Sequence, residues 1–434
     1  MKKLLVIANL YHASPRIPNL LTYLSNYGWD ISIVTVPLSK GAEEYLGFPM
    51  GFLEKAKIIE APYRGDIFWI WRKLFKLVGY KTDESITEQI KENFGITSKR
   101  SLVDALIKWY QTIYAYPDTE RLWKEPALKA ASNILREEHF DAILSSSPFP
   151  TSHIVAAELK RKYGICWLAD LRDLWTQNHA YPYGSMRRYF EKKLENKILS
   201  HVDRMATVSD GLAKKQMDFQ KRPVHVITNG FNPDHLNNPV APLTKKLTIT
   251  YTGKIYTDKQ DPEKYLVVLA NLISKTIINP SDIEVRFYGP CPNWFQDIVV
   301  KYHLRSIVKQ YGTIPRYESL KKQRESHLLL LFNWEDPREK GVYTGKIFEY
   351  LSAQRPILAT GGFHGSDLEK LLIETKAGDY ASNDDEIEAS MMSFYEEYKR
   401  SGKVFYKGDF NEINKYSYNE IAKKFTMLLD EMIQ

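Results

Sequence analysis

The amino-acid sequence predicts an α/β protein in which two Rossmann-like domains carry parallel sheets that face a cleft between the domains. Three observations support this fold class. The chain has 434 residues, more than one ordinary hydrophobic core accommodates. Short apolar runs alternate with segments of helical periodicity in two separate series. Between the two series, residues 232–246 contain three prolines and no periodicity, which is typical of a linker.

The first series begins with a strand, a helix and a strand, and it predicts a first Rossmann-like domain over residues 1–235. Its apolar runs are nearly continuous, which indicates parallel strands with helices on both faces of the sheet. In sheets of this kind ligands bind beyond the carboxyl ends of the strands. We expect strands at residues 3–9, 29–36, 141–145, 165–171, 205–208 and 224–228. We expect helices at residues 17–27, 126–138, 151–163, 186–200 and 209–219.

The regular alternation is interrupted between about residues 61 and 126, and we interpret this stretch as an insertion. Residues 67–78 combine a wide apolar face with basic residues on the opposite side. A basic amphipathic helix with aromatic residues is a candidate for lying in an anionic membrane surface, so residues of about 64–80 are a candidate peripheral membrane contact. The alternative, a helix packed on its own domain, stays open.

Polar residues at the predicted strand ends are candidates for contacting a ligand. Ser14 and Arg16 follow the first strand, Ser146 follows the strand at 141–145, and the last group follows the strand at 165–171. This last group consists of Arg172, Asp173 and His179. The alternatives are a simple turn with a solvated Arg16, and a salt bridge between Arg172 and Asp173 that only braces the loop.

The second series predicts a second Rossmann-like domain over residues 247–415, followed by a helix at 416–434 that returns to the first domain. We expect strands at residues 247–252, 283–288, 307–311, 327–332 and 356–360. We expect helices at residues 262–274, 294–302 and 317–324, a further helix that begins near residue 344, and a final helix at 418–433.

The helix that begins near residue 344 combines a phosphate-binding pattern with a carboxylate. Thr344 is a suitable N-cap, Gly345 allows a ligand to approach closely, and Lys346 adds a positive charge to the first turn. Glu349 lies one turn further on the same face, where a carboxylate suits hydroxyl groups better than phosphate. The alternative is an ordinary surface ion pair between Lys346 and Glu349.

The bulk composition narrows the class of protein. The hydrophobic fraction of 44% and the charged fraction of 26% are those of an ordinary globular protein. Cys166 and Cys291 have no metal-ligand spacing and suggest a reducing compartment. The apolar run at 4–10 lacks a signal-peptide cleavage site, and no run reaches the length of a membrane span, so we expect a cytoplasmic protein. The net charge of +7 suits phosphate ligands, nucleic acid or anionic lipid without choosing among them.

Four landmarks in this order resemble the GT-B glycosyltransferases of the retaining family four, which use nucleotide sugars. Gly253 and Lys254, with Lys259 five positions later, resemble the pair that binds the pyrophosphate. Residues 312–315, Gly-Thr-Ile-Pro, resemble the loop that contacts the base. Glu349 resembles the last glutamate of the E-x7-E motif, which implies a bidentate hold on the ribose hydroxyls. Residues 229–231, Asn-Gly-Phe, resemble the domain junction.

The resemblance implies that residues 1–235 bind the acceptor, with the strand-end candidates named above on the acceptor side, and that residues 247–415 bind the nucleotide-sugar donor. It also implies donor-site and catalytic residues. The donor-site residues are Gly253, Lys254, Lys259, Gly289, Thr313, Ile314, Tyr343, Thr344, Gly345, Lys346 and Glu349. The catalytic candidates are Lys254, Lys259, Glu349 and Asp173. Two positions depart from the family's pattern. Gly341 stands where the first glutamate of the motif is expected, and Ser146 lies near the position of a histidine that many members carry. His12, His153 or His179 could substitute for that histidine.

The implied activity is transfer of a sugar, with retention, from a nucleotide sugar with UDP or GDP to a saccharide or lipid-linked saccharide. Residues 141–148 and 169–175 look like a subgroup that builds polysaccharides. No Asp-x-Asp pattern stands at a strand end, so we expect no metal, no further cofactor and no nucleic-acid partner. We place the protein in the cytoplasm, with the inner face of the plasma membrane as a candidate site of peripheral attachment. The alternatives are a GT-B nucleotide-sugar epimerase and a non-catalytic partner subunit, the latter because of Gly341.

Overall fold

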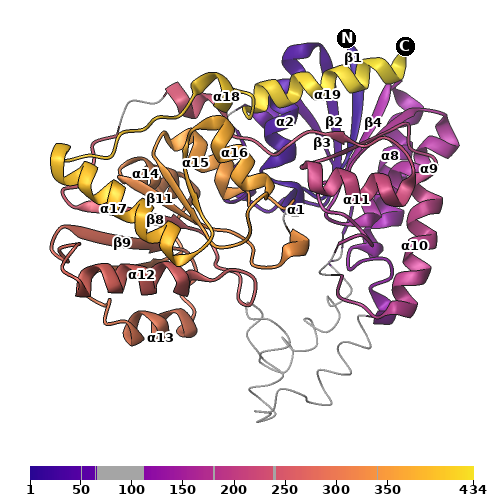
Figure 1. Ribbon diagram of the computed structural model, residues 1–434. Coiled ribbons are helices and arrows are strands. Elements are labelled where there is room, and N and C mark those ends of the chain that lie inside the picture. The colour runs from indigo at the N-terminus through magenta and orange to yellow at the C-terminus, as the bar shows by residue number, and fades with distance from the viewer. Residues whose placement is uncertain (50, 64, 66–111, 179–180, 238–240, 340) are drawn as a thin grey trace, which may run out of the picture.

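The computed structural model describes residues 1–49, 51–63, 65, 112–178, 181–237, 241–339 and 341–434 (Figure 1). The predicted membrane helix at 67–78 and the candidate His179 lie outside the described residues. The described chain forms two α/β domains, each built around its own parallel sheet. The predicted class, α/β with two parallel sheets, is therefore confirmed. None of the described helices combines the length and the apolar character needed to span a bilayer.

The first domain contains a seven-stranded sheet in the order β3-β2-β1-β4-β5-β6-β7. All of its strand pairs are parallel. The strands are β1 (Lys2–Ile7), β2 (Trp29–Thr35), β3 (Ala56–Glu60), β4 (Ala142–Ser146), β5 (Cys166–Asp170), β6 (Arg204–Thr207) and β7 (His225–Val226). The helices are α1 (Leu10–Ala13), α2 (Arg16–Leu24), α3 (Ala42–Leu46), α4 (Phe52–Lys55), α8 (Lys124–Glu137), α9 (Pro150–Tyr163), α10 (Ser185–Leu199) and α11 (Asp210–Gln220).

Alternate residues of β1 enter two different hydrophobic cores. Leu4 and Val6 pack in the core on the side of α2, whereas Leu5 and Ile7 pack in the core on the side of α8 and α9. This follows from the two-residue period of a strand, which points successive side chains to opposite faces. A strand covered on both faces must be apolar throughout, which is why the periodicity of this sequence could be interpreted as a buried parallel strand.

The C-terminal helix α19 (Tyr418–Ile433) belongs to the core of the first domain. Its buried residues include Ile421, Phe425 and Leu429, which share one hydrophobic cluster with Leu20 of α2 and with β1. Ser417 caps the helix by accepting a hydrogen bond from the Glu420 amide at 3.4 Å. In Figure 1 α19 lies beside α2 along the top of the first domain. The chain thus begins and ends in the same domain.

The second domain contains a six-stranded parallel sheet in the order β10-β9-β8-β11-β12-β13. The strands are β8 (Leu247–Thr252), β9 (Ile283–Tyr288), β10 (Val308–Gly312), β11 (Leu328–Phe332), β12 (Ile357–Thr360) and β13 (Gly378–Ala381). The helices are α12 (Pro262–Ser274), α13 (Asn293–Lys301), α14 (Arg316–Arg324), α15 (Lys346–Ala353), α16 (Asp367–Thr375), α17 (Asp384–Ser401) and α18 (Phe410–Asn414). Two of the four edge strands, β3 and β13, were missed by the sequence analysis, together with α16 and α17.

The chain crosses between the domains twice, and the two crossings run side by side. The Phe231 amide donates to the Tyr416 carbonyl at 3.1 Å, and the Tyr418 amide donates to the Phe231 carbonyl at 2.9 Å. Phe231 and Ser417 form a parallel β-bridge. The first crossing carries Gly230, where a Cβ atom would overlap the Tyr416 carbonyl oxygen and Ile421 Cδ1. We call these paired segments, residues 229–232 and 415–418, the junction ribbon.

Substitution at Gly230 tests the packing of the junction ribbon. We expect Gly230→Ala to lower the free energy of unfolding by about 1–3 kcal/mol, because the new methyl group must displace backbone and a buried isoleucine. Gly184→Ala is the matched control, since a Cβ at that position meets nothing within 4 Å. Urea unfolding of both variants measures the difference. Equal stabilities of the two variants would contradict the tight packing.

Candidate active site

A cleft of about 570 Å³ lies between the two domains, and residues of both domains line it. From the first domain it takes the strand-end residues Ser14, Arg16, Arg172 and Asp173. From the second domain it takes Tyr256, Lys259, Arg316, Trp334, Glu339, Tyr343, Thr344, Gly345, Lys346 and Glu349. Residues predicted separately for acceptor and donor therefore face one space.

Three glycines bring the carboxyl ends of the strands in the second sheet close together. The Gly253 amide donates to the Tyr288 carbonyl at 2.6 Å, and the Gly289 amide donates to the Gly312 carbonyl at 2.8 Å. Each has a positive φ, 102°, 150° and 74° for Gly253, Gly289 and Gly312, which glycine adopts without steric cost. A Cβ at Gly289 would overlap the Gly253 carbonyl. These glycines lie at the carboxyl ends of the strands, and none of the three is among the residues that line the cleft.

Lys346 begins α15 and packs against these strand ends. Its Nζ donates to the Lys254 carbonyl at 3.1 Å and lies 5.2 Å from the centre of the Tyr251 ring. A Cβ on Gly253 would come within 2.5 Å of Lys346 Cε, so the glycine makes room for the lysine. Burial lowers the pKa of Lys346 to about 8, against the opposing effect of the Glu349 charge. The structure thus holds a cation with a readily lost proton at the start of a helix.

Thr344 does not cap this helix as the sequence analysis predicted. Gly345 is the N-cap residue and has a helical backbone conformation, without a side chain to cap the helix. The Thr344 carbonyl accepts the Ile347 amide at 3.2 Å, while its hydroxyl oxygen is buried and has no hydrogen-bond partner among the described residues. The helix therefore starts one residue later than expected, and its first amides are not occupied by a threonine cap.

Glu349 is paired with an arginine that the sequence analysis did not single out. Arg316 Nη2 lies 2.6 Å from Glu349 Oε1, and Gln323 Nε2 lies 3.4 Å from Oε2. Arg316 directly follows the Gly-Thr-Ile-Pro loop, so the residue after that loop contacts the predicted ribose carboxylate. The alternative of a surface pair between Lys346 and Glu349 is not what the structure shows, since Glu349 pairs with Arg316.

The two other predicted lysines have different positions. Lys259 lines the cleft, with its Nζ 3.8 Å from Glu339 Oε1 and 5.7 Å from the Trp334 ring centre. Lys254 is exposed and its Nζ lies 5.6 Å from the Tyr256 ring centre. The residues of the donor prediction that do not line the cleft are Gly253, Lys254, Gly289, Thr313 and Ile314.

The loop before α15 carries a buried carboxylate and rests directly on the first domain. Glu339 is 4% exposed and lines the cleft, although no motif pointed to it. Two residues later, a Cβ on Gly211 of α11 would lie 2.6 Å from Gly341 Cα. The Ser209 hydroxyl donates to the Gly341 carbonyl, and Lys215 Nζ donates to the Arg338 carbonyl at 2.6 Å. Position 341 therefore has no room for a glutamate side chain.

Arg16 and Ser146, two acceptor-side candidates, are engaged inside the first domain. Arg16 is 1% exposed, and its guanidinium bonds Asp170 through Nε at 3.1 Å and Nη2 at 3.0 Å. Its remaining donors reach the carbonyls of Ile227 and Thr228 and the side chain of Asn229. The Ser146 hydroxyl donates to Asp170 Oδ2 at 2.8 Å. The alternative of a solvated arginine is wrong, because Arg16 is fully buried and paired.

The remaining first-domain candidates differ in their accessibility. Arg172 Nε lies 3.2 Å from Asp173 Oδ2, and both residues line the cleft, as does Ser14. His153 is 2% exposed and its Nδ1 lies 2.8 Å from the Ser145 hydroxyl, while burial lowers its pKa to about 4. His12 is exposed and stacks edge-on against Phe149. Neither histidine is among the residues that line the cleft.

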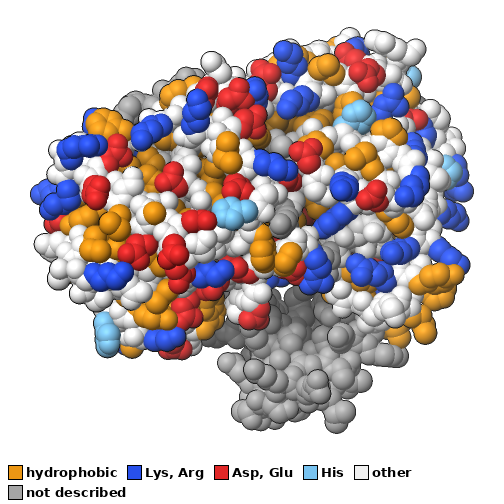
Figure 2. Space-filling model, viewed as in Figure 1, with side chains coloured by type: hydrophobic (Ala, Val, Ile, Leu, Met, Phe, Trp, Pro, Cys, Tyr) orange, Lys and Arg blue, Asp and Glu red, His pale blue; other side chains and the backbone are white. Residues whose placement is uncertain are grey.

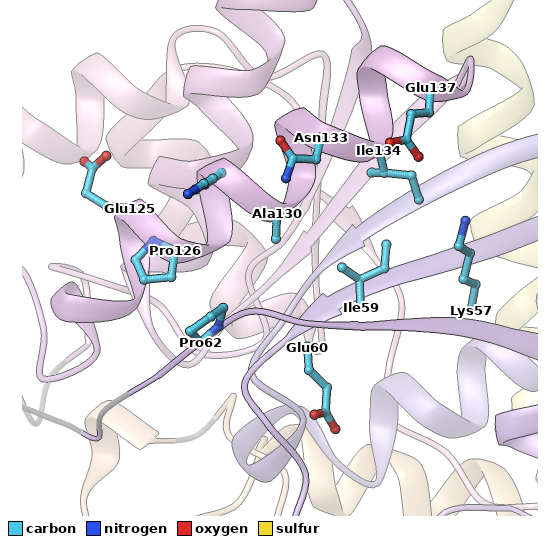
Figure 3. Close-up of a pocket in the computed structure, with 11 residues that line it drawn as sticks. Lys57, Ile59, Glu60, Pro62, Glu125, Pro126, Ala130, Asn133, Ile134 and Glu137 are labelled. Carbon is cyan, nitrogen blue, oxygen red and sulfur yellow. The ribbon is translucent and has the colours of Figure 1, made fainter.

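A second cavity, of about 800 Å³, opens between β3 and α8 (Figure 3). Figure 3 shows Ile59, Ala130 and Ile134 between the two elements, with Lys57 and Glu137 near one end. The residues that line it come from the first domain alone and include none of the predicted site residues. It therefore cannot join a donor to an acceptor, and we place the candidate site in the interdomain cleft. Among the described residues, no group of three or more potential metal ligands occurs.

Comparisons with known proteins agree with the architecture. Residues 97–235 match the model of Glycosyltransferase Family 4. Sucrose-phosphate synthase from Thermosynechococcus elongatus superposes with a TM-score of 0.59 at 12% identity, covering 99% of each chain. HepE from Anabaena, solved with UDP and glucose, superposes with a TM-score of 0.60 at 10% identity, covering 99% of this chain and 100% of its own. The fold is GT-B.

Proteins that are named for different activities share the GT-B fold. A putative UDP-N-acetylglucosamine 2-epimerase from Listeria monocytogenes superposes with a TM-score of 0.52 at 9% identity, covering 99% of this chain and 96% of its own. No curated protein sequence matches the chain significantly. The predicted resemblance to GT-B proteins of family four is confirmed by the family model and by the fold, and the donor, acceptor and site residues stay predictions.

The Arg16 network gives a test of the first-domain assignments. We expect Arg16→Ala to lower the free energy of unfolding by about 3–5 kcal/mol, because Asp170 is left charged and buried without its partner. Arg172→Ala is the control, since it breaks a pair whose aspartate is about half exposed, and should cost no more than about 1 kcal/mol. Urea unfolding measures the free energy of unfolding of both variants. Comparable losses in both variants would show that the buried network does not carry this stability.

Proposed function

We propose that the protein is a retaining glycosyltransferase that moves a sugar from a nucleotide sugar, with UDP or GDP, to a saccharide or lipid-linked saccharide. The observation that carries the proposal is the convergence of Lys259, Lys346 and Glu349 on one cleft between two parallel sheets. Cations suit a diphosphate, and a carboxylate suits the hydroxyls of a ribose. The family-four match in the first domain and the GT-B fold support the same activity.

The reaction breaks the bond between the anomeric carbon and the phosphate oxygen and forms a bond to an acceptor hydroxyl on the same face of the sugar. Positive charge develops on the sugar ring, and negative charge develops on the departing diphosphate. Lys259, Lys346 and the first amides of α15 lie where they stabilise that negative charge. The acceptor proton leaves with the diphosphate. Because protein cations supply the charge, the proposed transfer is independent of metal.

Glu339 is the carboxylate that we assign to the sugar end of the cleft. Gly341 cannot supply it, since the first turn of α11 fills the space around that residue. Glu339 lies two residues earlier, is buried, faces the cleft and is 3.8 Å from Lys259. A buried carboxylate next to a diphosphate-binding lysine suits the hydroxyls and the developing positive charge of the transferred sugar.

This assignment also bears on the two alternatives. The epimerase alternative shares the fold but needs no second substrate, whereas the cleft also contains Ser14, Arg172 and Asp173 from the first domain. The partner-subunit alternative rested on the missing glutamate at Gly341, and Glu339 removes that reason. We also propose that the acceptor belongs to cell-surface polysaccharide or glycan synthesis, with the protein in the cytoplasm or at the inner face of the membrane.

Binding of UDP or GDP to variants tests the donor site. We expect Glu349→Ala and Lys346→Met each to weaken binding about tenfold, since each removes one charged hydrogen-bond partner. Lys254→Ala should have a smaller effect, because Lys254 is exposed and does not line the cleft. Glu396→Ala, at an exposed position of α17, is the control. Isothermal titration calorimetry measures all four, and parental affinity in the first two would refute the donor site.

The variant Glu339→Gln distinguishes an effect on the rate of sugar transfer from an effect on nucleotide binding. We expect Glu339→Gln to reduce the rate of sugar transfer at least about a hundredfold while changing nucleotide affinity less than about threefold, because its carboxylate acts on the sugar rather than on the nucleotide. A panel of UDP- and GDP-sugars with chromatographic detection of released nucleotide measures the rate. A loss of nucleotide binding of the same size would contradict the assignment, and epimerised sugar without release of nucleotide would favour the epimerase.

The pKa of Lys346 predicts the pH dependence of donor binding. In the empty cleft this lysine loses its proton near pH 8, whereas a bound diphosphate favours the charged form and raises the pKa. Affinity is therefore full below pH 8 and falls as the pH rises, by about tenfold between pH 7 and pH 9. Titrations of UDP at both pH values measure this. The dependence should vanish in Lys346→Met, and an equal slope in that variant would exclude Lys346 as the titrating group.

A further inference from the structure

Helix α10 has its acidic residues inside, and its aromatic residues with two of its lysines outside. Glu191 and Glu195 are each 1% exposed, although carboxylates are rarely buried without partners. The outer side carries Met186, Tyr189 and Phe190, which are 77%, 54% and 53% exposed. Packing of this kind reverses the usual arrangement of a surface helix, which buries apolar residues and exposes charges.

The buried carboxylates hold the loop that lines the acceptor side of the cleft. Trp175 Nε1 donates to Glu191 Oε2 at 2.8 Å, and the Thr176 amide donates to Glu195 Oε2 at 3.1 Å. On the same helix, Arg188 Nη2 donates to the Asn178 carbonyl at 2.9 Å. This loop supplies Arg172, Asp173, Leu174, Gln177 and Asn178 to the cleft. The inner side of α10 is therefore part of the support of the candidate site.

The outer side continues as a basic stripe. Lys193 and Lys197 follow Tyr189 and Phe190 at helical spacing, and both are exposed. Lys193 Nζ lies 4.4 Å from the centre of the Tyr189 ring, so aromatic and cationic groups alternate on one surface. We call Met186, Tyr189, Phe190, Lys193 and Lys197 the α10 outer face. No acidic residue of α10 lies on it, because both acidic residues of the helix are buried.

The neighbouring segment extends this surface. Arg187 is buried and donates to the carbonyls of Thr112 at 2.8 Å and Pro117 at 3.1 Å, which fixes that segment beside the start of α10. The same segment carries Ile113 and Tyr114, each 47% exposed. Figure 1 places α10 at the outer edge of the first domain, on the side away from the second domain. Exposed apolar side chains gather here next to exposed lysines, on a domain edge that does not form the cleft.

We propose that the α10 outer face is a docking surface for a lipid bilayer with anionic headgroups. Aromatic and methionine side chains enter the interface between headgroups and acyl chains, while lysines contact the phosphates. Anionic headgroups supply counter-charges to Lys193 and Lys197 while the acyl-chain boundary accepts the apolar side chains of the same face. Figure 2 shows basic and acidic side chains interspersed over the visible surface of both domains, whereas the two acidic residues of α10 are buried and, of its charged residues, only Lys193 and Lys197 are exposed beside its aromatic residues.

The docking surface and the cleft loop share one helix. A bilayer on the outer side of α10 is therefore separated by this one helix from the loop that supplies Arg172 and Asp173. If the proposed glycosyl transfer is correct, this arrangement assigns the acceptor to the class of lipid-linked saccharides. The docking itself does not depend on the transfer, because it needs only the exposed side chains of α10.

Vesicle co-sedimentation of the full chain, without any sugar nucleotide, tests the docking surface. We expect binding to vesicles of phosphatidylcholine with about one third phosphatidylglycerol, and at least about tenfold weaker binding to phosphatidylcholine alone. The double variant Phe190→Ser with Lys193→Glu should bind the anionic vesicles at least about tenfold more weakly than the parent, because it removes one apolar anchor and reverses one charge. Failure of the parent to bind anionic vesicles would overturn the proposal.

A matched control changes an exposed apolar residue to serine and an exposed lysine to glutamate, at the same spacing, on the second domain. Ile373→Ser with Lys376→Glu replaces an isoleucine that is 70% exposed and an exposed lysine three residues later. It should bind vesicles within about twofold of the parent. An equal loss in both double variants would show a general effect of net charge and overturn the proposal.

A charge-only variant covers the case in which Phe190→Ser disturbs folding. Lys193→Glu with Lys197→Glu changes two exposed side chains and should reduce vesicle binding by at least about tenfold, with an unchanged melting temperature. Binding of UDP by each variant should equal that of the parent. Unchanged UDP binding together with lost vesicle binding separates the docking surface from the donor site, and parental vesicle binding in this variant would contradict the proposal.

Discussion

The buried ion pair between Arg16 and Asp170 fixes the carboxyl edge of the first sheet, on which the cleft depends. A guanidinium has five N–H groups, and here Asp170, two backbone carbonyls and Asn229 accept hydrogen bonds from it. Removing two charges from water is costly unless every polar atom is satisfied, and this network satisfies them. Because its acceptors lie at residues 227–229, where the chain leaves the first domain, the pair also sets where the second domain begins.

Local periodicity was sufficient for most of the fold. The bounds of β8, β9, α12 and α19 agree with the predicted ranges, since these elements have long apolar stripes. The edge strands β3 and β13 were missed because they have no such apolar stripe. β13 reads Gly-Asp-Tyr-Ala, and outer strands of a sheet are often short and polar because only one side is paired. Periodicity detects burial, and edge strands are only partly buried.

The candidate site was predictable in part. Lys346, Lys259 and Glu349 line the cleft. They could be predicted because helix starts and strand ends are recognisable along the chain. The partners of these residues were not, because they come from distant segments. Arg316 reaches Glu349, and Asp170 reaches Arg16 across 154 positions. Glu339 and the contact between Gly211 and Gly341 depend on how two domains meet, which no local pattern contains.

The junction ribbon has a mechanical consequence. A domain joined by a single linker can rotate in any direction, whereas two hydrogen-bonded segments behave as a two-stranded ribbon. Such a ribbon bends readily perpendicular to the plane of its two strands and resists bending within that plane. Motion between the domains is thereby reduced to essentially one rotation, with the hydrogen bonds of Phe231 along its axis. The cleft on one side of that axis can widen or narrow without the two sets of side chains sliding out of alignment.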